Sequence, residues 1–518
     1  MKRGDQALNR SGLLSRTFVR MTALAACALV TACAVGPDYR RPDAEVPQHY
    51  KEAGDWKVGT PNDAIARGTW WAIFNDPQLD ALEEQVAAAN QNILVAEAQY
   101  RQAQALVQSA RAAFYPTLGA SASATRSRSV RTTVNPDGSL STGTPSLLNS
   151  QSLSLDASWE LDLWGRIRRS VESNEASAQA SAGDLASALL SAQAALAQNY
   201  FQLRVTDTQK AVLQRTVADY ERFLKLTQNQ YAVGVAQRSD VLTAQTQLKQ
   251  AQALLLDSEV TRAQLEHAIA VLIGKPPAEF SLAPVNASNV DELPALPEIP
   301  LEVPSSVLER RPDIAAAERR MAAANAQIGV AKAAYFPTLT LGASAGLSAN
   351  TLTRLATLPS RVWSIGPSLA ATLFDAGARS AAVDKAGAAY DGTVATYRQT
   401  VLGAFQDVED NLAALRWQAQ EFDAQADAVK AAQEAAQLDL NRYRAGTISF
   451  LEVITAQATA YNAERTLLTL QGKRYSAAVL LVKALGGGWH GEVPAVGPKA
   501  RPLAGQAAPR PASAPAAQ

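Results

Sequence analysis

Four segments of this 518-residue chain alternate between apolar and polar side chains, three of them strictly and the one from Trp363 less cleanly, and they constrain the fold more than any other feature. In the clearest, the odd positions from Leu153 to Leu163 are apolar and the even positions are polar. The others begin at Thr117, Thr338 and Trp363. A period of two predicts β-strands with one apolar face. Lengths of about 9 to 12 residues suit tilted strands that cross a membrane.

The N-terminus has the pattern of a lipoprotein export signal. Five basic residues lie within the first 20 positions, and the apolar run 21–30 follows. This run is too short to span a bilayer, which needs about 20 residues. Small side chains then precede Cys33, so we expect cleavage before Cys33 and lipid attachment to it. Cys27 is a second, shorter match, and an ordinary secretory signal is the alternative. Ala34, where an aspartate would favour the inner membrane, favours the outer membrane.

The number of strands predicts an oligomer. Any one alternating segment would also suit a half-buried sheet of a soluble domain, but four in an exported chain favour a membrane barrel. Known barrels begin at about eight strands. An open sheet edge in lipid would leave backbone N–H and C=O groups unpaired. Several copies of the chain must therefore pool their strands.

The exported chain contains an internal duplication. Residues 112–118 match residues 333–339 at an offset of 221, and residues 231–234 match residues 443–446 at an offset of 212. The offset falls by nine, so the first half holds nine extra residues between these points. The polar stretch 126–150 is the expected loop.

Two long stretches without proline predict very long helices. They cover residues 166–231 and 379–443, and about 65 helical residues extend roughly 100 Å. No single core could bury such rods, so they must pack side by side. Shorter helices are expected over residues 79–113, 239–272, 314–335 and 450–485. The predicted fold class is mainly α with a membrane β-barrel.

Composition excludes several classes of function. The 48 basic and 48 acidic residues balance, which removes the electrostatic case for nucleic acid as a partner. The three histidines, His49, His267 and His490, lie far apart in the sequence. No metal-binding, phosphate-binding or catalytic motif accompanies them. We therefore expect no enzyme activity, no metal site and no cofactor.

Four short motifs connect these features to a known family. They are CAVGPDY at residues 33–39, WWAIFNDPQL at 70–79, LERRPDI at 308–314 and ALGGGW at 484–489. Each is weak alone, but together they resemble the TolC family of outer-membrane factors, in particular its lipidated NodT-type efflux branch. The resemblance covers roughly residues 33–490.

The resemblance implies both an architecture and a function. The architecture is a homotrimer with a twelve-stranded barrel in the outer membrane and an α-helical tunnel in the periplasm. The function is the channel-tunnel of a tripartite efflux system that exports small molecules such as drugs. The implied partners are a periplasmic adaptor (membrane fusion) protein, an inner-membrane pump of the RND type and outer-membrane lipid.

The same comparison divides the chain into five parts. Residues 1–32 are the signal peptide, and residues 33–78 are a lipidated periplasmic segment. Residues 79–290 and 305–488 are the two repeats. Residues 491–518 form an Ala/Pro-rich tail that we expect to be disordered.

The resemblance further implies a gate where the helices converge at their periplasmic tips. The carboxylates that match the family's gate positions are Asp240 and Glu452, and the matching tyrosines are Tyr443 and, in the first half, Tyr231. Acidic residues also favour the first turn of a helix for electrostatic reasons alone. The adaptor is expected to contact the tip turns, at Gly234, Val235, Gly446 and Thr447.

Two departures from the family pattern leave the number of charged rings open. Thr455 stands where the family has a second carboxylate, and Ile448 stands where it has an arginine. Arg442, Arg444 and Arg238 are candidates to replace that arginine.

Two other functions compete with the efflux duct. A passive porin would explain the strands but not two helices of such length. A structural coiled-coil lipoprotein that tethers the layers of the envelope would explain the helices and Cys33 but not four alternating strands.

Overall fold

The structure is a computed structural model that describes the chain from Val35 to Trp489, together with Gly491. Within this range the described residues are 35–43, 46–47, 49–53, 69–130, 132–134, 136–285, 287, 289–297, 299 and 310–489. The expected signal peptide, Cys33 and almost all of the expected tail lie outside the described residues.

The described residues form two compact units. The first combines the N-terminal segment up to Pro42 with residues 101–179 and 318–396. The second combines residues 43–100 and 180–317 with the chain from Tyr397 onward. Each unit therefore contains segments from both halves of the sequence.

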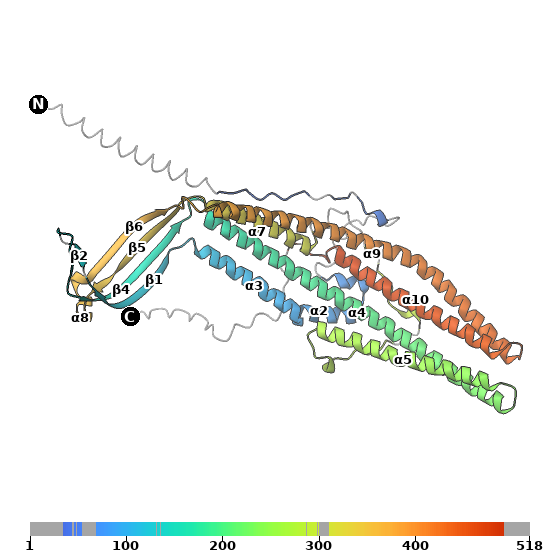
Figure 1. The fold of residues 1–518 in the computed structure, drawn as a ribbon. Helices are drawn as coiled ribbons and strands as arrows, with labels where there is room; N and C mark the ends of the chain where they lie inside the picture. Colours follow the sequence, from blue (N-terminus) through green and yellow to red (C-terminus); the bar gives the residue numbers. More distant parts are fainter. Residues whose placement is uncertain are drawn as a thin grey trace, which may run out of the picture. The chain divides into compact units, whose positions relative to one another are not determined.

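The first unit contains an antiparallel sheet of four strands (Figure 1). The strands lie in the order β1-β4-β5-β6, so β1 and β6 form the two edges of this sheet. This confirms the four strands predicted from the alternation. Their bounds are β1 (Thr117–Ser129), β4 (Ser146–Leu161), β5 (Thr338–Ala349) and β6 (Arg361–Ala370).

The polar stretch expected as a loop is more regular than predicted. Both flanking strands extend into it, and a small hairpin of β2 (Thr132–Val134) and β3 (Leu140–Thr142) lies between them. The hairpin turn contains Asp137, which accepts hydrogen bonds from the backbone N–H and the hydroxyl of Ser139 at 3.0 and 2.7 Å. Gly138 has a φ of 80°, which suits a tight turn. Turn chemistry thus folds most of this stretch into strands.

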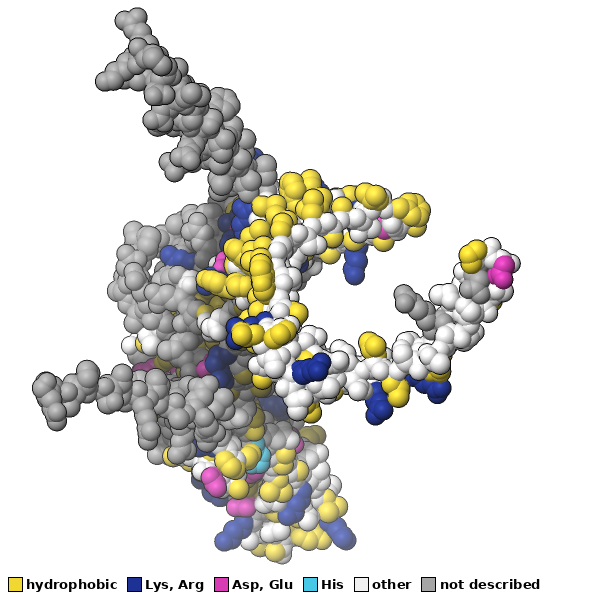
Figure 2. Space-filling model, turned by 90° about the vertical axis from the view of Figure 1, so that its left-hand side faces the viewer, with side chains coloured by type: hydrophobic (Ala, Val, Ile, Leu, Met, Phe, Trp, Pro, Cys, Tyr) yellow, Lys and Arg dark blue, Asp and Glu magenta, His cyan; other side chains and the backbone are white. Residues whose placement is uncertain are grey.

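The two faces of the sheet differ in chemistry. Large apolar side chains of one face are exposed, including Leu118 at 75% and Trp363 at 76%. Figure 2 shows hydrophobic side chains gathered on the convex side of the curved sheet. The other face carries serines that pair across strands, with 2.8 Å between the hydroxyls of Ser121 and Ser154 and also between those of Ser344 and Ser364. The convex face is therefore apolar, and the concave face is polar but mostly uncharged.

The helices match the predicted lengths closely. Helices α4 (Arg166–Ala232) and α9 (Ala378–Arg444) have 67 residues each. Helices α5 (Arg238–Leu272) and α10 (Phe450–Ala484) have 35 residues each. Helix α7 (Pro312–Ala333) begins at a proline, the residue best suited to the first helical turn. Among the described residues, no helix combines the length and apolarity needed to cross a membrane.

The helix expected over residues 79–113 is two helices, α2 (Pro77–Ala89) and α3 (Gln91–Ala112). Asn90 separates them with a ψ of 123°. Its side-chain oxygen accepts a hydrogen bond from the backbone N–H of Asn92 at 3.0 Å, and its amide donates to the carbonyl of Leu272 at 2.8 Å. The prediction of one helix is wrong because Asn90 caps α3 and is held by a residue distant in sequence.

Glu83 is the unusual residue on the buried face of α2. The rest of this face is formed by Leu79, Leu82 and Val86 at helical spacing. Glu83 is fully buried, and within the described chain neither of its carboxylate oxygens has a hydrogen-bond partner. Burial raises its pKa well above the ordinary value, and the charge of Asp80 acts in the same direction. The folded protein therefore keeps Glu83 as a neutral acid at a pH where exposed glutamates are ionised.

Replacing Glu83 with glutamine should remove a pH dependence of stability. Above the unfolded pKa of about 4.3 the folded chain holds the proton that the unfolded chain releases. Stability therefore falls as the pH rises from that value toward the raised pKa. We expect the melting temperature of the detergent-purified protein to decline across this window, and the decline to be smaller in Glu83→Gln. The exposed neighbour supplies the control, because Glu84→Gln should keep the wild-type slope. Parallel curves for wild type and Glu83→Gln would contradict this account.

Candidate functional site

A glycine-centred turn joins α4 to α5 in the second unit. Gly234 has a φ of 77°, a conformation that side-chain-bearing residues rarely adopt. Its N–H donates to the carbonyl of Tyr231 at 3.0 Å, and the N–H of Val235 donates to the carbonyl of Gln230 at 2.8 Å. This pair of hydrogen bonds is a Schellman motif, which satisfies the last carbonyls of α4. Val235 is left 75% exposed at the tip.

The turn between α9 and α10 repeats this geometry. Gly446 has a φ of 78°, and its N–H donates to the carbonyl of Tyr443 at 2.9 Å. The N–H of Thr447 donates to the carbonyl of Arg442 at 3.0 Å. Both predicted turns are thus confirmed as tight connections between helices, and both expose small residues at their tips.

The two predicted gate carboxylates occupy equivalent positions, three residues into the helices that leave the turns. Asp240 accepts a hydrogen bond from the backbone N–H of Gln237 at 3.0 Å. Glu452 accepts from the backbone N–H and the hydroxyl of Ser449 at 3.2 and 2.9 Å. Each therefore completes a capping box at the start of its helix. The hydrogen bond from the Ser449 hydroxyl lowers the pKa of Glu452, so this carboxylate stays ionised at neutral pH.

The predicted tyrosines have different environments. Tyr443 on α9 donates its hydroxyl hydrogen bond to the side-chain oxygen of Gln230 on α4, and its ring centroid lies 5.6 Å from that of Phe450. Burial raises the pKa of Tyr443, and the negative charge of Asp240 acts in the same direction. Tyr231 is 48% exposed. The structure brings Tyr443 and Asp240 together and leaves Tyr231 on the surface.

An apolar cluster holds the ends of the four long helices together behind the tips. Tyr220 and Phe223 of α4 and Phe450 of α10 belong to it, and Tyr443 packs against it. Sequence reasoning did not identify Gln230 or Phe450 as partners of Tyr443. Phe450 is the first residue of α10, where an aromatic side chain was the available signal.

Of the three candidate arginines, Arg442 is the one whose charge acts on a gate carboxylate. Its positive charge lowers the pKa of Glu452, after the contributions of Ser449. The Arg442 guanidinium also lies 3.4 Å from Asp439, one turn earlier on α9. Within the described chain, no group of three or more His, Cys, Asp or Glu side chains could hold a metal ion. The site can therefore offer charge, hydrogen bonds and small exposed side chains.

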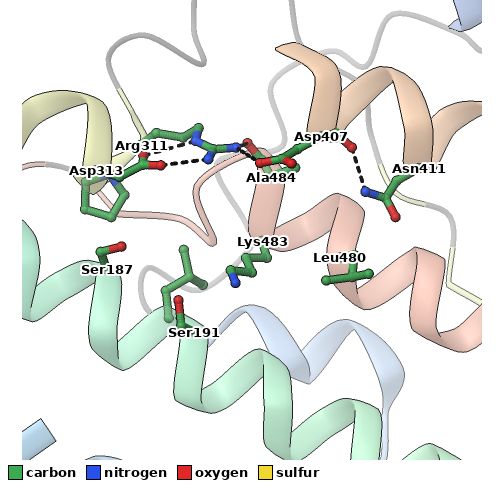
Figure 3. A pocket seen from close by; sticks show the side chains of 11 residues that line it. Ser187, Ser191, Arg311, Asp313, Asp407, Asn411, Leu480, Lys483 and Ala484 are labelled. Atoms are coloured by element: carbon green, nitrogen blue, oxygen red, sulfur yellow. Dashed lines mark hydrogen bonds and ion pairs between the residues drawn. The ribbon is translucent and has the colours of Figure 1, made fainter. Parts of the chain in front are cut away.

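Arg311 lies in a polar pocket elsewhere in the second unit (Figure 3). Its guanidinium donates to both carboxylate oxygens of Asp313 at 3.1 and 2.7 Å. It also donates to Asp407 of α9 at 3.1 Å and to the carbonyl of Ala484, the last residue of α10, at 3.2 Å. Only 11% of the Arg311 side chain is exposed. The pocket thus joins the segment before α7 to two other helices.

The motif at residues 484–489 meets the motif that contains Arg311. Gly486 has a φ of 97°, and a Cβ atom on it would lie 2.4 Å from the carbonyl oxygen of Arg310. Glycine is required here because backbone approaches backbone. These two motifs, distant in sequence, therefore form one clamp at the end of α10.

The motif at residues 70–79 forms a second clamp. Asp76 caps α2 by accepting from the backbone N–H groups of Gln78 and Leu79 at 2.9 and 3.2 Å. Its other oxygen accepts a 2.6 Å hydrogen bond from the hydroxyl of Tyr200 on α4. Trp70 and Trp71 are buried before it. This motif fixes α2 against α4.

The described part of the N-terminal motif is strapped onto the first unit. A Cβ on Gly36 would lie 2.5 Å from the Cα of Gly329, so α7 and this segment touch backbone to backbone. Asp38 forms a 2.7 Å ion pair with the buried Arg169 of α4. The N–H of Val35 donates to the carbonyl of Trp164 at 3.1 Å, just beyond the end of β4. Val35 is therefore held at the connection between β4 and α4.

Comparison with known proteins agrees with this architecture. The family model described as "Outer membrane efflux protein" matches residues 82–275 and 303–487. The chain is 32% identical over 489 residues to the pyoverdine export outer membrane protein OpmQ of Pseudomonas aeruginosa, covering 91% of this chain and 97% of the relative. It is 31% identical over 466 residues to the toluene efflux pump outer membrane protein TtgC of Pseudomonas putida, covering 89% and 94%.

A solved structure of the outer-membrane channel OprN is similar in fold. It superimposes with a TM-score of 0.78 at 31% sequence identity, covering 88% of this chain and all of that structure.

Replacing Arg311 with glutamine should lower the stability of the protein clearly. The change leaves two carboxylates and a helix-end carbonyl without their shared donor, and hydrogen bonds to charged groups each contribute about 1.5 to 3 kcal/mol. We expect the melting temperature in detergent to fall by about 3 °C or more. Arg222→Gln is the matched control, because Arg222 is 78% exposed and pairs with Asp219 on the same helix, an arrangement that contributes little. Equal melting temperatures for both variants would rule out the clamp.

Proposed function

The chain belongs to the outer membrane efflux protein family, and from this premise we propose that three copies assemble into one channel-tunnel of a tripartite efflux system. As an outer-membrane efflux protein it is a transport protein, working with an adaptor and an inner-membrane pump. The observation that carries the proposed trimer is the open four-stranded sheet with two unpaired edges. Three such sheets supply the twelve strands of a closed barrel, in which β6 of one copy pairs with β1 of the next.

The apolar exposed face and the serine-lined face of the sheet fit such a barrel. The apolar face contacts lipid, and the polar face lines the lumen. The long helices of the three copies then form the periplasmic tunnel. Matching lengths of 67 and 35 residues in the two halves support the division into repeats at residues 79–290 and 305–488.

We infer that Cys33 is the lipidated first residue of the mature protein. The position of Val35, two residues later, supports this, because its N–H is bound to the carbonyl of Trp164 just beyond the end of β4. Two residues of chain then suffice to place an acyl group at the membrane edge of the barrel, and residues 33–78 follow as a periplasmic segment.

Lipid attachment can be tested by labelling cells with palmitate and measuring the mass of the intact protein. Cys33→Ser should lose the label and the added mass, since the thiol is the attachment point. Cys27→Ser should keep both, because residue 27 is removed with the signal peptide. Loss of the label in Cys27→Ser alone would assign the lipid to Cys27. An unlabelled wild-type protein would indicate an ordinary secretory signal.

We propose that Asp240 and Glu452 form charged rings at the periplasmic end of the tunnel. In this gate Tyr443 stabilises the closed state, and Tyr231 lies on the surface of the gate. Three copies of a carboxylate around one axis repel each other and attract cations. Contacts such as the bond from Tyr443 to Gln230 hold the helices against that repulsion. Opening then requires the adaptor to replace these contacts.

Conductance in a planar bilayer tests this gate. Wild-type protein should conduct weakly. The double variant Asp240→Ala with Glu452→Ala should conduct several times more, because α5 and α10 lose the capping hydrogen bonds that fix their first turns. Asp240→Asn with Glu452→Gln separates two causes, since the amides can still cap the helices but carry no charge. Weak conductance in the amide variant would assign the effect to capping. Glu421→Ala with Asp427→Ala, two exposed acidic residues of α9, should leave the conductance unchanged.

We propose that the adaptor contacts the two tip turns, at Gly234, Val235, Gly446 and Thr447. The turns expose small residues and lie at the ends of the helix pairs that they connect. The cargo is selected by the pump before it reaches the duct, so the relatives' cargoes, pyoverdine and toluene, identify only the range of small molecules to test first.

Site-specific cross-linking tests the adaptor contact. The sequence holds only two cysteines, both near the N-terminus, so a new cysteine is the single free thiol of the lipidated protein. Val235→Cys and Thr447→Cys should each cross-link to the adaptor in cells. Leu256→Cys, 69% exposed but far along α5, should not. Cross-linking from Leu256→Cys alone would move the contact away from the tips.

A further inference from the structure

The apolar face of the sheet ends in arginines on the side where β1 connects to β4 and β5 connects to β6. On β1 this face consists of Leu118, Ala120, Ala122 and Ala124, and the next two residues on it are Arg126 and Arg128. On β6 the first residue, Arg361, pairs with Leu347 of β5 and so lies on the same face. All three arginines stand at or near the ends of their strands that are opposite to the junctions with α3 and α9.

These arginines have no partner within the described chain. Each is exposed, and none of the three side chains forms a hydrogen bond or ion pair with another described residue. Residues two apart on a strand lie about 7 Å apart on one face. Arg126 and Arg128 therefore present two adjacent positive charges.

Negative charge near the sheet lies elsewhere. Asp156 is on the opposite face, where it accepts a hydrogen bond from Ser154 at 2.8 Å. Glu160 pairs with Arg166 at 2.7 Å, and Asp137 is bound to Ser139 in the hairpin turn. The lipid-facing side thus carries unneutralised positive charge directly beyond its apolar band.

We propose that Arg126, Arg128 and Arg361 bind the phosphate groups of lipids in the outer leaflet of the membrane. The inference rests on the proposed barrel, in which β6 of one copy lies beside β1 of the next. Arg361 of one copy then joins Arg126 and Arg128 of its neighbour at each seam between copies. A phosphorylated lipid at the seam contacts both copies at once.

The chemistry of the patch suits this ligand. A guanidinium offers parallel N–H donors that match two phosphate oxygens. Trp363 lies next to Arg361 along the same face, 76% exposed, where an aromatic ring suits the boundary between acyl chains and headgroups. Acyl chains can cover the alanine and leucine side chains while the phosphates meet the arginines.

A binding titration with lipid A tests the proposal on the intact, detergent-purified oligomer. The probes are lipid A with two phosphates, the same lipid without phosphate, and inorganic phosphate alone. Native mass spectrometry measures how much lipid stays bound, and the melting temperature reports the linked gain in stability. We expect wild-type protein to bind the phosphorylated lipid about tenfold more tightly than the dephosphorylated one, as three weak charge pairs acting together would give.

Variants assign the effect to the three arginines. Arg126→Gln with Arg128→Gln and Arg361→Gln should lose the tenfold preference, and the corresponding lysine variant should keep most of it. Lys225→Gln with Lys385→Gln and Arg398→Gln removes the same charge from exposed helix positions and should behave as wild type. An unchanged preference in the triple glutamine variant, or an equal stabilisation by inorganic phosphate, would overturn the proposal. Aggregation of that variant with its lipid preference intact would assign the arginines to protecting the strand edges instead.

Channel conductance separates this proposal from the proposed function. In bilayers of zwitterionic lipid, the triple glutamine variant should form channels like those of wild type. Conducting channels without any phosphate preference would overturn only the lipid site. A wild-type oligomer that never conducts would overturn the channel itself, and the seam site with it.

Discussion

Backbone hydrogen bonding at the edges of one small sheet constrains everything else in this protein. Among the described residues, strands β1 and β6 each have one side without a partner strand. In water this arrangement is tolerable, but in hydrocarbon each unpaired N–H or C=O group costs several kcal/mol. In the proposed trimer the neighbouring copies pair these edges, so assembly and entry into the membrane become one requirement. In that trimer the helices that follow the strands are arranged around the same axis.

The helical part of the chain solves a different problem, because rods of 67 residues cannot form a core of their own. They pack against one another through buried apolar side chains, and small polar clamps fix their positions. Arg311 ties Asp313 to Asp407 and to the end of α10, and Asp76 ties α2 to Tyr200 of α4. Each clamp uses charge-assisted hydrogen bonds with defined geometry, which set the register of neighbouring helices more specifically than apolar contact can. The tips lie far along the same helices, where a small apolar cluster and the hydrogen bond from Tyr443 to Gln230 hold the ends together.

Much of this could be predicted from the sequence, because long helices and alternating strands leave periodic patterns. The ends of α4 and α9 fall within one residue of their predicted positions, since a glycine with positive φ lies beside each end. The break at Asn90 could not be predicted, because it depends on the carbonyl of Leu272, 182 residues away. Glu83 was equally hidden, since only packing distinguishes it from its exposed neighbour Glu84. The four motifs resemble those of a known family, but the sequence does not reveal that they act as clamps. That role depends on contacts between distant residues, such as Arg310 with Gly486 and Asp38 with Arg169.

The serine pairs on the concave face have a consequence for transit. Each hydroxyl in a pair, such as Ser121 with Ser154 or Ser123 with Ser152, already has a hydrogen-bond partner across the strands. Such a wall wets readily, because the paired hydroxyls keep further hydrogen-bonding capacity that water can satisfy, and it offers a passing solute little apolar area. A molecule in contact with it gains almost nothing over remaining in water, so its dwell time is short. In the proposed barrel the lining is therefore a low-friction surface, and flux is set by supply from the periplasmic end rather than by release from the wall.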